Sequence, residues 1–479
     1  MSVAIWWIRR DLRLEDNPAL WAACEHESLI PLYIHAPEEE LEAGPGAASR
    51  WWLHHSLEAL RQDLGAQGLR LVLRKGAHAQ AVLDAVLEES GAEAVYWNRQ
   101  YAPAQLARDA SIKTALRSRG LRAESFNSAL LFEPWQMSRQ NQPYKVFTPF
   151  WKACLAQGVD QGVSALPRVW PKDCAHISSE ALESFGLLPA TGWDQGFNTC
   201  WSPGAVGAWR ALTAFVKERL PGYAHDRDRP GISGSSRLSP HLHFGEIGPR
   251  QIVNNVLASL AGDVHEGAQA YFRELGWREF AHHQLYHFPH TLSQPLNPRW
   301  ECFPWPETDE HLWESWIKGN TGIPLVDAGM RELWQTGWMH NRVRMNAASL
   351  LVKNMLIPWW RGERWFFDTL VDADIANNVL GWQWVAGCGA DAAPYFRIFN
   401  PVLQGERFDS DGRYVRRWVP ELAALPDRWL HRPWAAPREV LGAAGVTLGV
   451  HYPYPVVDLA RSRDRALLAA KTINKTNRQ

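Results

Sequence analysis

The sequence predicts an α/β fold followed by an all-α fold within one chain. Over the first 130 residues, short apolar runs alternate with amphipathic stretches, which is typical of a doubly wound parallel sheet. From residue 201 onward, strand patterns nearly vanish and helical periodicity recurs. This later part holds 17 of the 27 tryptophans of the chain. We therefore expect an α/β domain at residues 1–130, a connector at 131–200 and a helical domain at 201–479.

Each element of the α/β part has its own pattern. Apolar runs predict the strands, and the amphipathic stretches between them predict the covering helices. The first strand is not followed by G-x-G-x-x-G, so the glycine-rich dinucleotide fingerprint is missing. The expected strands are Val3–Ile8, Leu29–His35, Leu69–Leu73, Ala94–Trp97 and Arg122–Phe126. The expected helices are Ala19–Cys24, Arg50–Gly65, Ala77–Glu88 and Pro103–Arg119.

The connector contains more residues that interrupt regular secondary structure than the helical part does. Pro, Ser, Gln and Gly interrupt the connector, so we expect a packed surface segment with a few helical turns. The final run AAKTINKTNRQ is basic and polar, and we expect a frayed end. The later helices are expected at Ala205–Glu218, Pro249–Leu260, Ala268–Tyr286, Pro324–Gln335, Asn341–Met355, Glu363–Asp372 and Pro437–Gly442.

The composition excludes several classes of protein. The net charge is -1, so any nucleic-acid footprint would have to be local. The apolar runs are short and the apolar start precedes basic residues, which argues against a membrane span and a signal peptide. No cysteines are spaced as C-x-x-C, so neither a disulfide framework nor a zinc or iron–sulfur site is expected. We expect a reduced cytoplasmic protein.

The stretch from Asp372 to Pro401 is the most informative part of the chain. Within it, Asp372, Asp374 and Asn378 supply hydrogen-bonding groups that a buried polar ligand can use. Trp382 and Trp384 add large flat apolar surfaces. An aromatic pair and a cation follow at Tyr395, Phe396 and Arg397. This combination predicts a site for a planar, hydrogen-bonding cofactor beside a stacking platform.

Two helices carry further candidate groups. Glu274, Trp277 and Arg278 fall at i, i+3 and i+4 and share one helix face, which suits a base or a ring-shaped ligand. The alternative is an internal ion pair beside a core tryptophan. On a second helix, Asn341, Arg342 and Met345 lie close together while Arg344 turns to another face; the alternative is the solvated edge of a packed helix.

The segment GSSRLS, residues 234–239, surrounds one arginine with small hydroxyls and backbone donors ahead of a helix. Such a loop suits phosphate oxygens, although a serine-rich turn with a helix cap is the commoner explanation.

Two other clusters resemble metal sites. Glu279, His283 and His287 have helical spacing but lack the H-E-x-x-H order, so we expect no metal there. Asp372 and Asp374 are not followed by a glycine-bearing calcium loop, which favours hydrogen bonding to a ligand or a helix cap.

The motifs together resemble the photolyase/cryptochrome flavoproteins, and most closely the bacterial enzymes that repair cyclobutane pyrimidine dimers, of class I or class III type. The resemblance runs from WWIRRDLRLEDNPAL at residues 6–20 to WVPEL at 418–422. Five specific motifs occur in family order: GSSRLSPHLHFGEIGPRQ, LGWREF, TGWMHNRVRM, DADIANN-x-x-GWQW and DAAPYFRIFNP. The resemblance implies an amino-terminal α/β antenna domain and a helical domain that holds FAD.

The resemblance also implies roles for individual residues at the cofactor. Asn378 matches the residue that faces flavin N5, where plant cryptochromes generally have an acid, so the amide favours repair. Residues matching the phosphate and ribityl positions are Tyr223, Ser235, Ser236, Arg237, Leu238 and Ser239, with Tyr271 beside them. Residues matching positions around the isoalloxazine and adenine are Arg344, Asp372, Asp374 and Asn378.

A further set matches the lesion and DNA contacts of the family: Glu274, Trp277, Arg278, Asn341, Arg342, Met345, Trp384, Gln404 and Arg227. Enzymes of this family take their target bases out of the base stack. Trp277 and Trp384 would form two walls for the extruded dimer, with stacking worth roughly 1–3 kcal/mol per base. Glu274 would hydrogen-bond a thymine. The DNA phosphates would be contacted by Arg227, Arg278 and Arg342. Light-excited reduced FAD would then donate an electron that opens the ring.

Three tryptophans resemble the chain that carries electrons to FAD from the surface. Trp382 and Trp359 align directly, Trp305 aligns after a one-residue shift, and Trp360 is a candidate branch.

The resemblance also bears on the lesion and the antenna pigment. Relatives that repair the (6-4) photoproduct use a histidine where this chain has Asn341, and single-strand-preferring relatives replace Trp384, so cyclobutane dimers in duplex DNA are favoured. Gln105 and Leu106 stand where the usual folate anchor has Asn and Glu. We still favour a methenyltetrahydrofolate antenna; a deazaflavin or no pigment is the alternative.

Three other functions compete with repair of cyclobutane dimers. They are a cryptochrome-type blue-light photoreceptor without repair activity, (6-4) photoproduct repair, and a tryptophan-rich helical binding module without a cofactor, which would be colourless. We expect a monomer without an obligate protein partner, bound to UV-damaged DNA of the bacterial nucleoid and not to a membrane.

Overall fold

The computed structural model describes residues 2–39, 44–260, 262, 264–392 and 396–475. The chain divides into two compact units. Unit 1 comprises Met1–Leu220, Ser236–Pro289 and Val371–Ala376. Unit 2 comprises Pro221–Ser235, His290–Leu370 and Asn377–Gln479. The domain boundaries expected near residues 130 and 200 stay a prediction.

Unit 1 contains the predicted parallel sheet, which confirms the α/β class. The strand order is β3-β2-β1-β4-β5, and every neighbouring pair is parallel. The strands are β1 Val3–Ile8, β2 Ser28–His35, β3 Val72–Lys75, β4 Ala94–Asn98 and β5 Arg122–Phe126. A two-residue strand from the connector, β8 Lys172–Asp173, also pairs with β2. The third strand lies three residues later than the sequence predicted, because Leu69 and Leu71 are buried ahead of it without joining the ladder.

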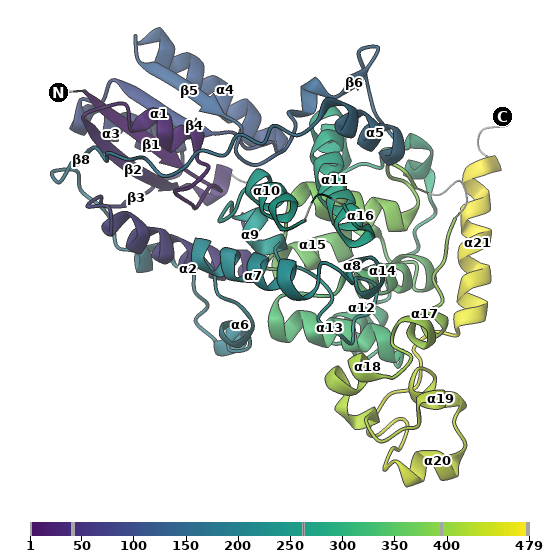
Figure 1. Ribbon diagram of the computed structural model, residues 1–479. Helices are drawn as coiled ribbons and strands as arrows, with labels where there is room; N and C mark the ends of the chain where they lie inside the picture. The colour runs from purple at the N-terminus through teal and green to yellow at the C-terminus, as the bar shows by residue number, and fades with distance from the viewer. Residues whose placement is uncertain (1, 40–43, 261, 263, 393–395, 476–479) are drawn as a thin grey trace. The chain divides into compact units, whose positions relative to one another are not determined.

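Helices cover both faces of this sheet, with α4 on one side and α2 on the other (Figure 1). Leu83 of α3 and Ile112 of α4 share one core cluster with Ile5 and Trp7 of β1. The first helix begins where Asn17 accepts a hydrogen bond from the Leu20 amide at 3.1 Å, with Pro18 in the first helical position. These helices are α1 Pro18–Ala23, α2 Ala47–Gly65, α3 Ala79–Ser90 and α4 Pro103–Ser118.

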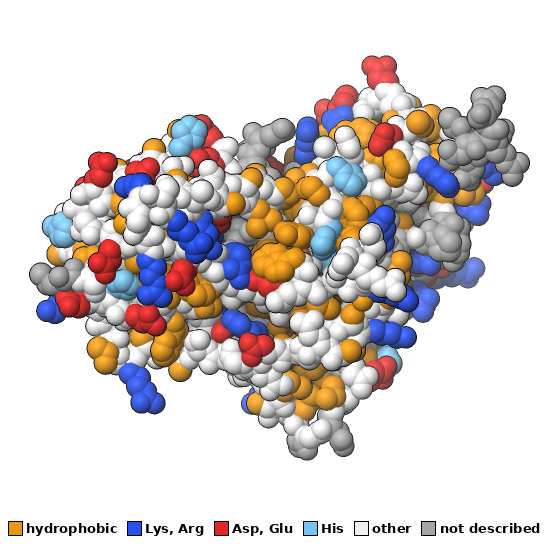
Figure 2. Space-filling view, turned by 90° about the horizontal axis from the view of Figure 1, so that it is seen from above, with side chains coloured by type: hydrophobic (Ala, Val, Ile, Leu, Met, Phe, Trp, Pro, Cys, Tyr) orange, Lys and Arg blue, Asp and Glu red, His pale blue; other side chains and the backbone are white. Residues whose placement is uncertain are grey.

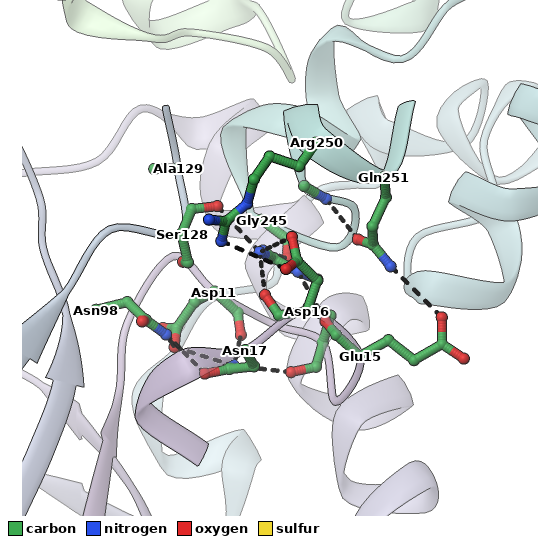
Figure 3. A network of polar contacts seen from close by, with 12 residues as sticks. Asp11, Glu15, Asp16, Asn17, Asn98, Ser128, Ala129, Gly245, Arg250 and Gln251 are labelled. Atoms are coloured by element: carbon green, nitrogen blue, oxygen red, sulfur yellow. Dashed lines mark hydrogen bonds and ion pairs between the residues drawn. The ribbon is translucent and has the colours of Figure 1, made fainter. Parts of the chain in front are cut away.

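A buried polar network joins the sheet to the later segments of unit 1 (Figure 3). Arg13, 2% exposed, donates to the carbonyls of Gly245 at 2.9 Å, Asp16 at 2.7 Å and Ser128 at 3.0 Å. Arg250 lies 3.3 Å from the Asp16 carboxylate. Because buried polar groups are costly unless satisfied, this network holds the segments in one arrangement.

The connector contains more regular secondary structure than its content of Pro, Ser, Gln and Gly predicted. It includes an eleven-residue helix, α5 Phe147–Gln157, and a small hairpin of β6 Ser138–Arg139 and β7 Gln142–Pro143. Its first residues are held by a later segment of the same unit, because Glu279 accepts from the backbone amides of Leu131 and Phe132 at 2.9 and 3.1 Å.

Five of the seven helices expected after residue 201 begin and end within two residues of the predicted bounds. Other helices of this part were not predicted, including Glu310–Ile317, Ile375–Ala386 and Leu459–Lys475. The helices of the all-α part that lie in unit 1 are α6 Phe197–Cys200, α7 Ala205–Glu218, α9 Ser239–His243, α10 Pro249–Ser259 and α11 Glu266–His287. The others are α8 Tyr223–Asp226, α12 Glu310–Ile317, α13 Pro324–Thr336, α14 Asn341–Ser349, α15 Trp359–Thr369, α16 Ile375–Ala386, α17 Pro401–Phe408, α18 Arg413–Trp418, α19 Asp427–Leu430, α20 Arg438–Ala443 and α21 Leu459–Lys475.

Three helix predictions need correction. The helix expected to reach Met355 ends at Ser349 and continues as a π-helical turn at Leu350–Asn354. The helix expected at Glu363–Asp372 instead begins at Trp359 and ends at Thr369. The expected frayed end is wrong up to residue 475, since Ala466 and Ile473 of α21 pack in a cluster with Phe303 and Leu356; residues 476–479 lie outside the described part.

Charged groups of both signs share the face of the molecule seen in Figure 2. Over the left part of Figure 2, which holds the α/β sheet, Lys and Arg side chains alternate with Asp and Glu. All six thiols are free. Among the described residues, no helix combines the length and apolarity that a membrane span requires, and no group of three acidic, His or Cys side chains is placed to hold a metal.

Candidate functional site

The acidic residues ahead of α16 are held by unit 1. The Ser239 hydroxyl donates to Asp372 at 2.7 Å. His243 and His282 lie 3.9 and 3.5 Å from one oxygen of Asp374. Burial opposes charge on Asp374, but the two histidines and Arg278 outweigh it and hold the pKa of this carboxyl well below its usual range. Asp374 is therefore a buried, ionised acceptor.

The serine-rich loop makes a tight turn in the same unit. Arg237 has a φ of +57°, in the left-handed region that ordinary side chains rarely adopt. Its guanidinium lies 4.3 Å from the centre of the Trp201 ring. The Ser236 hydroxyl accepts from the Leu238 amide at 3.4 Å and also hydrogen-bonds Tyr271, whose pKa is raised by burial.

Trp277 of α11 has one face covered. The ring of Phe147 lies parallel to it, with centroids 3.7 Å apart and an angle of 8°. Trp277 and Glu274 are both half-buried. Arg278 points inward and donates to the Ala129 carbonyl at 2.7 Å, with its side chain 13% exposed.

In unit 2, Glu363 of α15 fixes the carboxamide of Asn378. The Asn378 amide nitrogen donates to the Glu363 carbonyl at 3.0 Å and to its carboxylate at 2.8 Å. Both amide hydrogens are thus used, and the amide oxygen is the group left to face a ligand donor. Burial raises the pKa of Glu363 to about 7, with the Asn378 hydrogen bond and Arg364 acting in the opposite direction.

The neighbouring residues of α14 lie as the spacing predicted. Asn341 donates to the Met345 sulfur at 3.9 Å, while Arg342 pairs with Asp228 at 2.6 Å. Arg344 turns away and donates to the Met339 carbonyl at 2.7 Å.

Four further predicted residues also lie in unit 2. Arg227 lies over the ring of the buried Tyr223, with 5.7 Å from its guanidinium to the ring centre. Gln404 of α17 is half-buried. The Trp384 indole donates to the Asp391 carbonyl at 3.1 Å. Tyr395 lies outside the described residues.

The tryptophans of the predicted electron chain also belong to unit 2. Trp360 contacts both Trp359, at 5.9 Å between centroids, and Trp305, at 5.8 Å. Trp382 is buried against Phe366 at 5.0 Å and Trp316 at 6.2 Å. Gly362 permits this packing, because a Cβ there would lie 2.1 Å from the Trp382 ring.

Sequence reasoning missed two supporting residues, Phe147 and Glu363. Phe147 lies in the connector, far from α11 in sequence, and nothing local marks it as the backing of Trp277. Glu363 precedes Asn378 by 15 residues, so only the packing of α15 against α16 reveals it. The histidines of the cluster that resembles a metal site have partners within the protein. His283 and His287 both lie within hydrogen-bonding distance of the Pro134 carbonyl.

A parallel α/β sheet, a helical part rich in tryptophan, and buried carboxylate and carboxamide acceptors together define a flavoprotein of the photolyase/cryptochrome class. The chain matches the family described as "DNA photolyase" over residues 4–170 and the "FAD binding domain of DNA photolyase" over residues 271–472. It belongs to the DNA photolyase family.

Similar proteins cover the whole chain. It is 46% identical to a deoxyribodipyrimidine photo-lyase of Agrobacterium fabrum, over 98% of each chain. The crystal structure of a bacterial class III photolyase from Agrobacterium tumefaciens superposes with a TM-score of 0.92 at 46% identity, covering 99% of this chain and 98% of that one. Cryptochrome-1 of Arabidopsis thaliana is 39% identical, over 96% of this chain and 69% of its own length.

Proposed function

We propose that this protein uses light and bound FAD to repair cyclobutane pyrimidine dimers in DNA. The observation that carries the proposal is the similarity over the full length, at 46% identity, to a deoxyribodipyrimidine photo-lyase. Cryptochrome-type photoreception is the second candidate, because cryptochromes are also similar over most of this chain. Asn378 favours repair, since the resemblance places an acid there in plant cryptochromes.

The donors and acceptors present fit a flavin dinucleotide. Asp374 is an ionised, buried acceptor for ring N–H groups, and the oriented oxygen of Asn378 is an acceptor for a flavin N–H. The left-handed turn at Arg237, with serine hydroxyls on both sides, suits phosphate oxygens. When bound, reduced FAD supplies the electron that light drives onto the lesion and that returns after ring opening.

The chain's own residues would bind and orient the damaged bases. Trp277, backed by Phe147, offers one ring face for stacking, and Trp384 is the proposed second wall. These two tryptophans belong to different units, so their pairing around a lesion stays a prediction. Glu274, Asn341 and Met345 are the proposed contacts to the dimer.

Four other residues are proposed to bind the DNA strand. Arg227, Arg342, Arg278 and Gln404 would contact DNA, with Arg278 contributing only the part of its guanidinium not used by Ala129. UV-damaged DNA is the partner we propose, approached by a monomer in the bacterial cytoplasm.

We propose that Trp382, Trp359 and Trp305 carry electrons inward from the surface. We include Trp360, which the sequence indicated only as a candidate branch, because its ring contacts both Trp359 and Trp305. These four tryptophans, Trp382, Trp359, Trp305 and Trp360, form the proposed relay.

For the antenna we propose methenyltetrahydrofolate, with a deazaflavin or an empty site as the alternatives. A cavity of unit 1 is lined by Trp7, Arg9, Arg10 and Arg108 among others, a setting of rings and cations that suits an anionic, ring-bearing pigment. Its volume of about 20 Å³ holds roughly one water molecule, so a pigment there would require side chains to move. Mass spectrometry of the pigment released on denaturation distinguishes the three outcomes.

The repair assay tests the main proposal. Purified protein is reduced, illuminated with a dimer-containing thymine oligonucleotide, and followed by the return of thymine absorbance. Recovery is expected, and Trp382→Phe should lose light-driven FAD reduction while repairing normally when reduced beforehand. FAD-loaded protein that gives no recovery would support the photoreceptor instead.

A further inference from the structure

A cavity of about 270 Å³ lies in unit 2 at the outer end of the relay. Four tryptophans line it: Trp300, Trp305, Trp359 and Trp360. Trp360 is 38% exposed, although leaving an indole in water forfeits much hydrophobic stabilisation. The volume is near the lower end of the range for small-molecule sites. It accommodates one or two fused rings.

The wall of this cavity is rigid before any ligand arrives. The side chain of Gln383, 1% exposed, donates to the carbonyls of Thr291 and Gln294, each at 2.8 Å, and accepts from the Leu296 amide at 2.9 Å. The backbone N–H of Asn297 donates to the Cys388 carbonyl at 2.9 Å. A site that needs no reorganisation loses little binding free energy to ordering.

The polar groups around the cavity narrow the chemistry of its ligand. Ser293, Gln294 and Glu301 are exposed lining residues and offer acceptors for a hydroxyl donor. The Glu301 carboxylate disfavours an anion. The Lys353 amine lies 5.8 Å from the centre of the Trp300 ring, but it is buried and donates to the Ala386 carbonyl at 2.8 Å, so it is already engaged within the protein. The lining thus suits an uncharged ring that carries a hydroxyl group.

We propose that this cavity binds an uncharged phenolic reductant that resupplies electrons to the relay. The inference rests on the relay proposed above. When Trp305 or Trp360 has lost one electron to the inner tryptophans, the bound phenol gives one electron to the indole radical cation. The phenolic O–H bond breaks, the proton leaves to solvent at the open mouth, and a phenoxyl radical departs. One electron and one proton are lost by the ligand, and the tryptophan is restored.

Binding is tested first in the dark with 2-naphthol, an uncharged two-ring phenol, followed by its fluorescence anisotropy. Saturable binding is expected with the FAD-loaded protein. Ser293→Trp fills the mouth of the cavity without altering a relay residue and should weaken binding at least tenfold. Ser410→Trp, which changes an exposed serine of unit 2 outside this lining, is the matched control and should bind like the unsubstituted protein. Non-saturable binding, or equal affinity in Ser293→Trp, overturns the site.

The electron step is tested under illumination. The rate of FAD reduction should saturate with 2-naphthol at the concentration that half-fills the site in the dark, and rise without saturation with dithiothreitol. Ser293→Trp should lose the saturable phase and keep the dithiothreitol rate. A linear dependence on 2-naphthol overturns the donor role. If neither reductant supports FAD reduction, the relay itself is wrong, whereas the dark titration still decides the binding site.

Discussion

At the scale of single residues, the orientation of one amide decides which group Asn378 would offer to the flavin in the proposed site. Asn378 is able to present either its oxygen or its nitrogen, and the sequence does not say which. The two hydrogen bonds to Glu363 settle the choice in favour of the oxygen. Glu363 thus acts as a positioning residue, one step removed from the proposed cofactor.

Glu363→Gln should loosen this orientation. A glutamine offers its own N–H₂ to Asn378, so the Asn378 amide is free to turn over. Losing one oriented hydrogen bond, worth about 1 kcal/mol, should shift the two-electron potential of bound FAD by about 20–30 mV. Redox titration measures the shift, with FAD content as a check on binding. Glu406→Gln, on α17, is the control, and equal shifts in both variants would remove Glu363 from this role.

Glu274 lies on the same helix as Trp277, the proposed wall residue, and its proposed role can be tested by substitution. Glu274→Ala should lower the repair yield roughly 10- to 100-fold, because a hydrogen bond to a charged group is worth about 1.5–3 kcal/mol. FAD content should stay intact. Glu266→Ala removes an exposed carboxylate at the start of the same helix and should leave the yield unchanged. Unaltered repair by Glu274→Ala would take this residue out of the reaction.

At the scale of elements, the contact of α15 with α16 places both Asn378 and Trp382. Gly362 and Glu363 are adjacent on α15, and they face residues one helical turn apart on α16. Gly362 lets the Trp382 ring approach, and Glu363 holds the amide. The same contact therefore serves the proposed cofactor site and the relay.

Gly362→Ala should force α15 away from the Trp382 ring. Overpacking of this kind costs about 1–3 kcal/mol, which lowers Tm. Gly381→Ala, on α16, is the matched control: its Cβ would meet no atom within 4 Å, and replacing a helical glycine by alanine should stabilise by about 0.5–1 kcal/mol. Thermal unfolding of both variants, followed by circular dichroism, checks the opposite signs.

How much the sequence could predict also differs by element. Alternation and periodicity are local, so they placed the sheet strands and most of the helices that they predicted within a few residues. They did not predict α12, α16, α17 or α21. The π-helical turn at Leu350–Asn354 and the packing of α21 depend on distant partners such as Phe303 and were not accessible. The site motifs identified residues by type and order, but their supports, Phe147 and Glu363, come from other segments.

At the scale of the whole molecule, a net charge of -1 requires DNA binding to depend on a few placed cations. Arg342→Ala should lower the slope of log affinity against log salt by about one unit. Arg438→Ala, an exposed arginine of α20, should change the slope less. Filter binding across a salt series measures both. An unchanged slope for Arg342→Ala would mean that this side chain serves Asp228 rather than a phosphate.

The pH dependence of stability is governed by buried groups of opposite sign, two of which lie one turn apart on α11. Burial raises the pKa of Glu279 to about 7, against the opposing effects of Arg278 and two backbone amides. The unfolded carboxyl releases its proton near its ordinary pKa of about 4.3, so Glu279 makes stability fall as pH rises from there to about 7. Burial lowers the pKa of His283 to about 4. The unfolded imidazole gains its proton near pH 6.5, so His283 makes stability fall as pH drops from there to about 4.

The gain in the free energy of unfolding, relative to the unsubstituted protein, should therefore rise with pH for Glu279→Gln and fall with pH for His283→Gln. Relative to that protein, Glu279→Gln should gain up to roughly 3 kcal/mol in the free energy of unfolding between pH 4.5 and 7. His283→Gln should gain a similar amount as pH falls from 6.5 to 4. Urea unfolding at half-unit pH intervals measures both differences, and each variant is the control for the other, because a general loss of packing would lower stability equally at every pH. Parallel curves would mean that these two groups titrate in the folded protein as they do in water.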